Sequence, residues 1–111
     1  MRLMVCGSRS WKYRSLVRGW LIHFHPTVVI HGGAEGADSV AEDVARELGI
    51  LTDVRRPDPT RPSPQRYHER NDQMLKECDF MLAFWDGKSP GTKSVIDKAK
   101  RRKIPHKVIT P

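Results

Sequence analysis

The stretch that decides the fold reads Val28-Val29-Ile30-His31-Gly32-Gly33-Ala34-Glu35-Gly36-Ala37-Asp38. A short run of β-branched residues breaks into glycines and then opens a helix with apolar periodicity, which is typical of a strand-to-helix turn in an α/β sheet. Glycine is required at such a turn, because a Cβ would block both the tight turn and the close approach of a ligand. Since the turn presents backbone N–H groups, it predicts a site for a phosphate or a sugar.

Strand and helix patterns alternate along the rest of the chain. Five strands are expected at Arg2–Cys6, Thr27–Ile30, Leu51–Arg55, Asp79–Trp85 and His106–Ile109. Four helices are expected at Tyr13–Phe24, Gly36–Leu48, Pro64–Glu77 (with Ser63 as its N-cap) and Thr92–Arg102. This alternation predicts one Rossmann-like domain over residues 1–111, a three-layer α/β/α arrangement around a five-stranded parallel sheet in the order 3-2-1-4-5.

The same patterns place the strands within that sheet. The third strand is more polar and is expected at an edge, whereas the fourth is a nearly continuous apolar run and is expected in the centre. Ligands of such a fold bind at the carboxyl edge, at the switch point between strands 1 and 4. The loops that carry Gly7, Gly32-Gly33-Gly36 and Gly87-Gly91 all fall at that edge.

The composition is that of an ordinary globular protein. Charged residues make up 30% and hydrophobic residues 38% of the chain, and no apolar run reaches the roughly 20 residues of a membrane span. No secretory signal is recognisable, so no membrane partner and a cytoplasmic location are expected. Cys6 and Cys78 fall at opposite edges of the predicted sheet, too far apart for a disulfide, and are expected to be buried, reduced and structural. They have no histidine partners at suitable spacing, so neither a metal site nor a cofactor is predicted.

The net charge of +7 comes from three basic clusters. These are Arg9-Lys12-Arg14-Arg18, Arg55-Arg56-Arg61-Arg66 and Lys98-Lys100-Arg101-Arg102-Lys103-Lys107. A basic field attracts nucleic acid, nucleotides or other polyanions. The alternative is a solvated helix face and tail, which is the favoured interpretation of the last cluster.

Four segments of the predicted carboxyl edge carry the candidate ligand-binding residues. They are Gly7, Ser8 and Arg9 after the first strand, His31, Gly32, Gly33, Gly36 and Asp38 in the glycine turn, Arg70 and Asn71 on the third helix, and Trp85, Lys88, Gly91 and Thr92 after the fourth strand. An arginine guanidinium and a helix N-terminus can bind an anion, and an indole ring can stack on a base.

Several of these side chains have two open interpretations. Asp38 either accepts hydrogen bonds from ribose hydroxyls or caps its own helix. His31 is either a buried, hydrogen-bonded residue or a ligand contact, and Trp85 either stacks on a base or belongs to the core. Arg70 and Met74 lie one turn apart on one helix face, so Arg70 is expected to point to the carboxyl edge while Met74 packs on the sheet.

Together the four segments resemble the SLOG superfamily, Rossmann-like domains named for the DNA-processing protein Smf/DprA and the cytokinin-activating LOG enzymes. Its YspA/YpsA-related branch carries a G-S-R start, an H-G-G-A-x-G-A-D turn, an R-N-x-x-M helix and a G-x-G-T-type loop. The similar segments of this chain are, in the same order, Gly7-Ser8-Arg9, His31 to Asp38, Arg70 to Met74 and Gly87 to Thr92. That branch consists of small single-domain proteins of bacteria and phages. The resemblance implies a pocket for a nucleotide or nucleotide derivative at the carboxyl edge.

LOG enzymes cleave the bond between a base and ribose monophosphate, and the resemblance bears on whether this chain does so. Arg70 matches their arginine, but Val95 stands where they have a glutamate, and valine cannot act as an acid or a base. Asp97 lies about 200° further around the helix and is a poor substitute. If the chain is an enzyme of this type, the candidate catalytic residues are Arg70, Asp38 and Asp86.

Three functions are therefore weighed. The first is binding, for sensing or sequestration, of a nucleotide-derived ligand such as an ADP-ribose- or NAD-related molecule, because two phosphate-suited loops lack a matched catalytic carboxylate. The second is a nucleotide N-glycosidase or phosphoribohydrolase of the LOG type. The third is single-stranded DNA binding, motivated by the charge and ranked last because few aromatic residues in the basic clusters look exposed. Whether the chain forms a homo-oligomer is left open.

Overall fold

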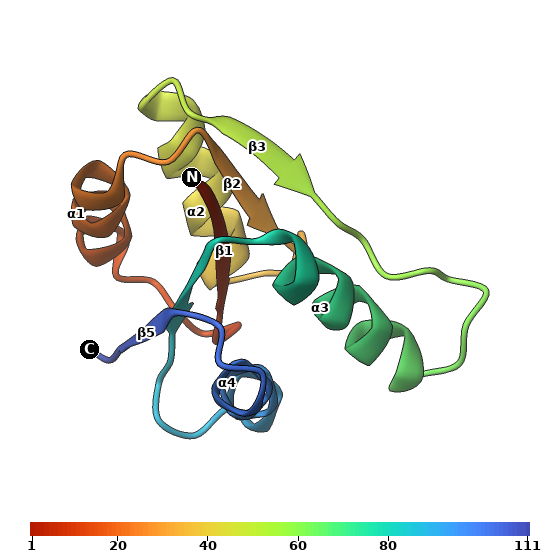
Figure 1. Ribbon diagram of the computed structural model, residues 1–111. Coiled ribbons are helices and arrows are strands. Elements are labelled where there is room, and N and C mark those ends of the chain that lie inside the picture. The colour runs from red at the N-terminus through yellow and green to blue at the C-terminus, as the bar shows by residue number, and fades with distance from the viewer.

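The computed structural model describes residues 1–111, in which strands and helices alternate (Figure 1). The strands are β1 (Arg2–Gly7), β2 (Val28–His31), β3 (Leu51–Val54), β4 (Phe80–Phe84) and β5 (His106–Ile109), and the helices are α1 (Arg14–Phe24), α2 (Ala37–Glu47), α3 (Gln65–Glu77) and α4 (Pro90–Arg101). All neighbouring strands are parallel, in the order β3-β2-β1-β4-β5. The predicted fold class and strand order are confirmed.

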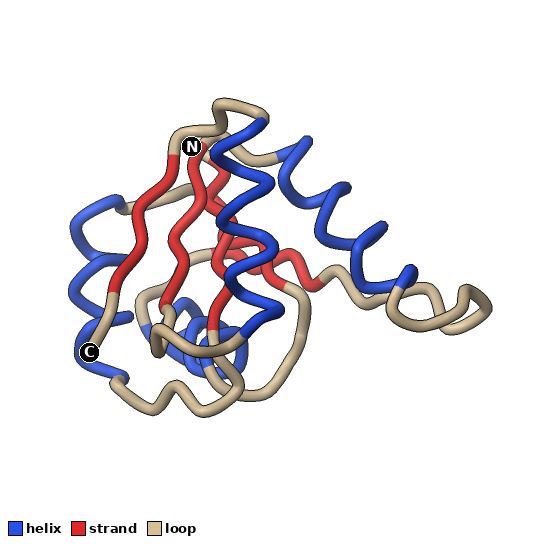
Figure 2. The backbone as a smooth tube through the Cα atoms, turned by 90° about the horizontal axis from the view of Figure 1, so that it is seen from below, coloured by secondary structure: helices blue, strands red, loops and turns tan.

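Helices cover both faces of the sheet (Figures 1 and 2). Successive side chains of a strand point to opposite faces, and in β1 this sends Leu3 and Val5 into the core under α1 and α2, and Met4 into the core under α3 and α4. Strand β4 is buried from Met81 to Phe84, as expected for a central strand. Strand β3 forms an edge of the sheet, with Leu51 exposed.

Helix α2 packs closely because its inner face is made of small side chains. Ala37, Ala41 and Ala45 are all fully buried in the α1/α2 core. The helix stops at Gly49, which has a φ of +72°. The next N–H, of Ile50, donates to the carbonyl of Ala45 at 2.8 Å, which is the bond expected after a C-terminal glycine.

Some element boundaries differ from those predicted. Pro64 is the N-cap of α3 and makes no side-chain cap, so the prediction that Ser63 caps this helix is wrong. Helix α4 starts two residues earlier than expected, at Pro90, because proline is favourable at the first helical position. Strand β2 extends to His31, which brings that side chain into the interior.

Both cysteines are free, but they are half-buried rather than fully buried as predicted. Cys6 Sγ lies 3.8 Å from Met81 Sδ, and Cys78 Sγ lies 3.5 Å from the carbonyl oxygen of Leu75. Burial raises the pKa of both thiols. Because the thiolate is the reactive form, both side chains are expected to be inert.

Candidate functional site

The loop after β1 is held tightly between β4 and the start of α2. A Cβ on Gly7 would lie 2.3 Å from the carbonyl oxygen of Phe84 and 2.6 Å from Ala37 Cβ. Gly36 has a φ of +79°, and a Cβ there would lie 2.3 Å from the carbonyl oxygen of Ser8. Only glycine fits at these two positions, so both residues shape the carboxyl edge through close backbone approach.

Ser8 is buried and connects three segments of this edge. Its N–H donates to the carbonyl of Phe84 at 2.9 Å, and its carbonyl accepts from Trp11 and Ala37 at 3.1 and 3.2 Å. Its Oγ accepts the N–H of Asp86 at 2.9 Å. Ser8 therefore organises the loops, and its polar atoms are engaged within the protein.

Asp38 occupies the glycine turn with its own carboxylate. Its Oδ2 accepts the N–H groups of Gly32 at 3.1 Å and Ala34 at 3.2 Å. Burial raises the pKa of Asp38, although these hydrogen bonds and the charge of Arg70 oppose the rise. The carboxylate thus closes the loop that precedes its helix. Contrary to the expectation from the sequence, these two amides are not free for a phosphate.

His31 also serves the turn from inside. Its Nδ1 accepts the N–H of Gly33 at 3.0 Å, and its Nε2 lies 2.7 Å from Glu42 Oε1. Because Nδ1 accepts a hydrogen bond, Nε2 carries the proton, and its N–H donates a hydrogen bond to Glu42 Oε1. With 2% of the side chain exposed and both ring nitrogens engaged, His31 fixes the shape of the turn.

Glu42, the hydrogen-bond partner of His31, makes the stability of the glycine turn dependent on pH. Burial alone would raise the pKa of Glu42, but hydrogen bonds from His31, Arg46 and Thr52 lower it from 4.5 to about 2. An acid with a depressed pKa in the folded state stabilises the fold above its ordinary pKa, and this stabilisation is lost as the pH falls toward the lower value.

We expect the free energy of unfolding, measured with urea, to fall between about pH 5 and pH 2.5. In the Glu42→Gln variant the free energy of unfolding should fall less steeply over the same range. The control is Asp43→Asn on the same helix. Equal slopes for Glu42→Gln and the wild-type chain would contradict this assignment.

Arg70 reaches the glycine turn from α3, as expected. Its Nη1 donates to the carbonyl of Gly32 at 2.8 Å and to that of Arg55 at 3.3 Å, and its Nε donates to Asn71 Oδ1 at 2.9 Å. Met74, one turn later, is buried against the sheet. Burial lowers the pKa of Arg70. The guanidinium therefore ties the ends of β2 and β3 to α3.

The loop after β4 is closed by Asp86. Its Oδ1 accepts the N–H groups of Ser89 and Lys88, both at 2.8 Å, and these bonds hold the pKa of Asp86 well below its usual range. Trp85 donates its indole N–H to the carbonyl of Ser89 at 3.1 Å and packs against the α3/α4 core. Asp86 is thus a loop-forming carboxylate, while Lys88 stays exposed.

The start of α4 is exposed to solvent at Pro90 and Gly91. Its N-cap, Ser89, makes no side-chain cap hydrogen bond, so the first N–H groups stand uncapped at the positive end of the helix dipole. A Cβ on Gly91 would have nothing within 4 Å, and the neighbouring Thr92 is buried. Val95 is buried in the α3/α4 core, and Asp97 accepts a bond from Lys93 at 2.9 Å. The helix therefore offers no carboxylate at the position of the LOG glutamate.

Cations without an ion-pair partner surround the carboxyl edge. Arg9 and Lys12 follow β1, Arg56 follows β3 and Lys88 follows β4, and none of the four pairs with a carboxylate. By contrast, the arginines of α1 pair with carboxylates of α2, and two basic residues at the end of α4 pair with α3. The uncompensated positive charge of the first two basic clusters is therefore concentrated in the loops that follow the strands.

Two exposed tyrosines lie among these cations, and the sequence analysis missed both. Tyr13 is 44% exposed and directly follows Lys12, and Tyr67 is 38% exposed and directly follows Arg66. The Arg70 guanidinium carbon lies 5.8 Å from the centroid of the Tyr67 ring. The expectation that the basic clusters expose few aromatic residues is wrong at these two positions. The alternation of aromatic and basic residues was the available signal.

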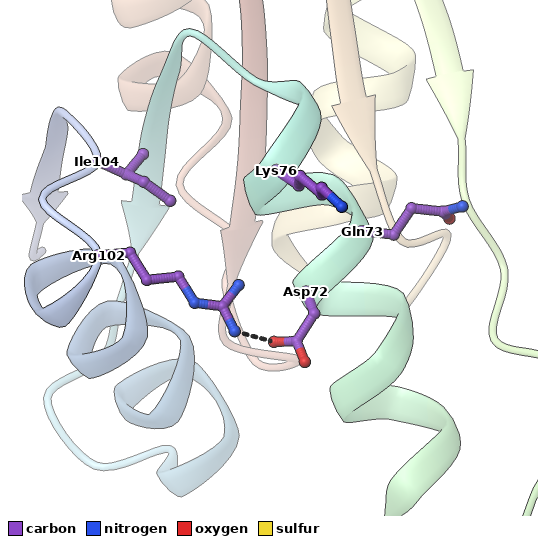
Figure 3. Close-up of a pocket in the computed structure, with 5 residues that line it drawn as sticks. All are labelled: Asp72, Gln73, Lys76, Arg102 and Ile104. Atoms are coloured by element: carbon purple, nitrogen blue, oxygen red, sulfur yellow. Dashed lines mark hydrogen bonds and ion pairs between the residues drawn. The ribbon is translucent and has the colours of Figure 1, made fainter.

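Two cavities lie beside α3. One, of about 600 Å³, is lined by α3 and by residues that follow α4, where Arg102 pairs with Asp72 at 3.2 Å (Figure 3). The other, of about 220 Å³, lies between α3 and the loop after β3. Neither lies between the loops that follow β1 and β4. No three His, Cys, Asp or Glu side chains are grouped so as to hold a metal ion, and no helix is long and apolar enough to cross a membrane.

The fold and this edge define a Rossmann-like α/β domain with a basic rim at the carboxyl ends of its strands. The same fold occurs in DNA processing protein A from Helicobacter pylori, whose structure describes a unique mode of single-stranded DNA binding. The TM-score is 0.71 at 17% identity, with 100% of this chain and 66% of that chain covered. The chain belongs to the family of the Gene 61 protein of Mycobacterium phage D29. The two are 35% identical over an alignment of 115 positions, which covers 94% of this chain and 92% of that protein. No model of a known protein family matches it.

Proposed function

We propose that this chain binds single-stranded DNA along the carboxyl edge of its sheet. The observation that carries the proposal is the placing of exposed tyrosines beside unpaired cations, Tyr13 next to Lys12 and near Arg9, and Tyr67 next to Arg66. Proteins that bind single strands stack bases on aromatic rings and hold the phosphates with a positively charged groove. Both parts of such a surface are present here.

The geometry favours a strand over a small nucleotide-derived ligand. A small-molecule site is a concave pocket that buries most of its ligand, and the two cavities described above lie beside α3 instead of between the loops that follow β1 and β4. Asp38 and Asp86 also take four of the loop amides that a nucleotide phosphate would need. DNA processing protein A, which shares the fold, adds support because it binds single-stranded DNA.

We also propose that the chain falls within the SLOG superfamily, in the YspA/YpsA-related branch, and that residues 1–111 act as one binding unit. The support is the set of four motifs. Three of them lie in loops at the carboxyl edge, and Arg70 of the fourth motif donates a hydrogen bond to the carbonyl of Gly32 at that edge. This placement is compatible with the DNA-binding proposal, because Smf/DprA is one of the two founding members of the superfamily.

The test is fluorescence anisotropy with a labelled oligothymidylate of about 20 nucleotides, a length that covers the site of one small domain. We expect binding that is tighter than to duplex DNA, with a logarithmic salt slope of about −0.7 for each phosphate contacted. Arg9→Gln with Lys88→Gln should weaken it, and Lys100→Gln with Arg101→Gln, at the far end of α4, serves as the charge-matched control. No binding of the oligonucleotide at low salt, together with calorimetric binding of ADP-ribose or NAD, would overturn the proposal. Release of free base from nucleotides would instead support the LOG-type hydrolase.

A further inference from the structure

We propose that the smaller cavity beside α3 holds an internal phosphate of the bound strand, in a second anion subsite formed by Arg56 and Arg66. This inference rests on the proposed DNA binding and extends it. The bound strand would run from the loop after β1, across the glycine turn, to α3. Arg56 and Arg66 lie outside the motifs that carry the SLOG resemblance, while Arg70 of one motif also lines the cavity.

The cavity is built from polar side chains alone. Its lining consists of Arg56, Asp58, Arg66, Glu69, Arg70 and Gln73, around a volume of about 220 Å³. Arg66 Nε is buried and donates to no acceptor in the protein. A buried donor without an acceptor is unfavourable, so a ligand oxygen that accepts from it gains the bond without breaking another.

The carboxylates of the cavity form no ion pair with these two arginines, although the hydrogen bonds from Thr60 and, after them, the charge of Arg66 lower the pKa of Asp58. Glu69 is held by Arg61 at 3.0 Å and by Gln65 at 2.9 Å. Asp58 Oδ1 accepts the N–H and the hydroxyl of Thr60 at 2.9 and 2.7 Å. Neither Arg56 nor Arg66 forms an ion pair, so both charges are available to an anion.

The position of Arg56 connects the cavity to the carboxyl edge. Its Nη1 lies 2.8 Å from where a Cβ on Gly33 would stand, so the guanidinium lies directly against the glycine turn. On the other side, the Arg66 guanidinium carbon lies 6.0 Å from the centroid of the exposed Tyr67 ring. A phosphate between two guanidinium forks is well matched in geometry, and an adjacent base then has a ring on which to stack.

The experiment follows the arginine Nε–H signals of the ¹⁵N-labelled chain by NMR. They are titrated first with inorganic phosphate and then with oligothymidylate that lacks terminal phosphates. We expect the Arg66 signal to shift with both. Arg66→Gln should weaken oligonucleotide binding about tenfold and reduce the salt slope by about 0.7, the value for one phosphate contact. Arg66→Lys should recover only part of the affinity, because lysine lacks the fork, and Arg101→Gln should change little.

The outcomes separate this inference from the proposed function. If the wild-type chain binds the oligonucleotide and Arg66→Gln leaves its affinity and salt slope unchanged, the subsite is overturned while DNA binding stands. If binding requires a terminal phosphate on the oligonucleotide, the assignment to an internal phosphate is overturned. If inorganic phosphate shifts the Arg66 signal but no oligonucleotide binds, the cavity is a site for free phosphate, and both the inference and the proposed function fail.

Discussion

Replacing Gly36 with alanine is expected to lower the free energy of unfolding by about 3 kcal/mol, the largest effect of any single methyl group added to this chain. Gly36 has a φ of 79° and a ψ of −123°, a conformation open essentially to glycine alone. A Cβ there would also lie 2.3 Å from the carbonyl oxygen of Ser8 and 2.4 Å from that of Arg9. Because the Ser8 carbonyl accepts from Ala37, moving it separates β1 from α2.

Two other glycines are matched controls for this measurement by urea unfolding. Gly49 has a φ of +72° but nothing within 4 Å of its added Cβ, so Gly49→Ala should show only the left-handed strain of roughly 1–2 kcal/mol. Gly19, inside α1, has neither a positive φ nor a close neighbour, and Gly19→Ala should stabilise the chain by about 0.5–1 kcal/mol. A Gly36→Ala chain as stable as Gly49→Ala would show that the loop after β1 is not clamped as described.

The second large effect is expected at the exposed tyrosines. Removing an aromatic platform costs about 1–3 kcal/mol for each stacked base, so Tyr13→Ala and Tyr67→Ala should each weaken oligothymidylate binding at least about fivefold. Together they should weaken it by the product of the two factors if the rings hold separate bases. Both rings are only partly exposed, and Tyr13 packs edge-on against Trp11 with ring centroids 5.3 Å apart, so urea unfolding of each variant is measured to separate lost affinity from lost stability.

Phenylalanine variants test whether stacking is the cause. Tyr13→Phe and Tyr67→Phe keep the ring and should retain most of the affinity, whereas Leu51→Ala removes an exposed apolar side chain from the start of β3 and should leave binding unchanged. Anisotropy titrations of all six variants, including the double alanine variant, at one salt concentration give the comparison. Full affinity in the double alanine variant would remove the basis of the DNA-binding proposal.

Much of the carboxyl edge could be predicted from local pattern. The strand order follows from the alternation of apolar runs and amphipathic segments, and the orientation of Arg70 follows from its spacing to buried Met74. The local sequence pattern could not predict which partner each polar group bonds to. Asp38 and Asp86 are both candidate catalytic residues in the sequence, yet each accepts hydrogen bonds from backbone amides of its own loop, because the folded turn brings those amides to the carboxylate.

The sequence by itself determined the elements, their parallel order and the position of the glycine turn, because hydrophobic periodicity and glycine conformation act over a few neighbouring residues. Only the tertiary structure decided which charges remain free. Arg14 pairs with Asp43 because α1 packs beside α2, whereas Arg9 and Arg56 extend from loops with no such neighbour. Pairing depends on distances between segments far apart in the chain, and so the surface available to a polyanion became visible only once the helices were in place.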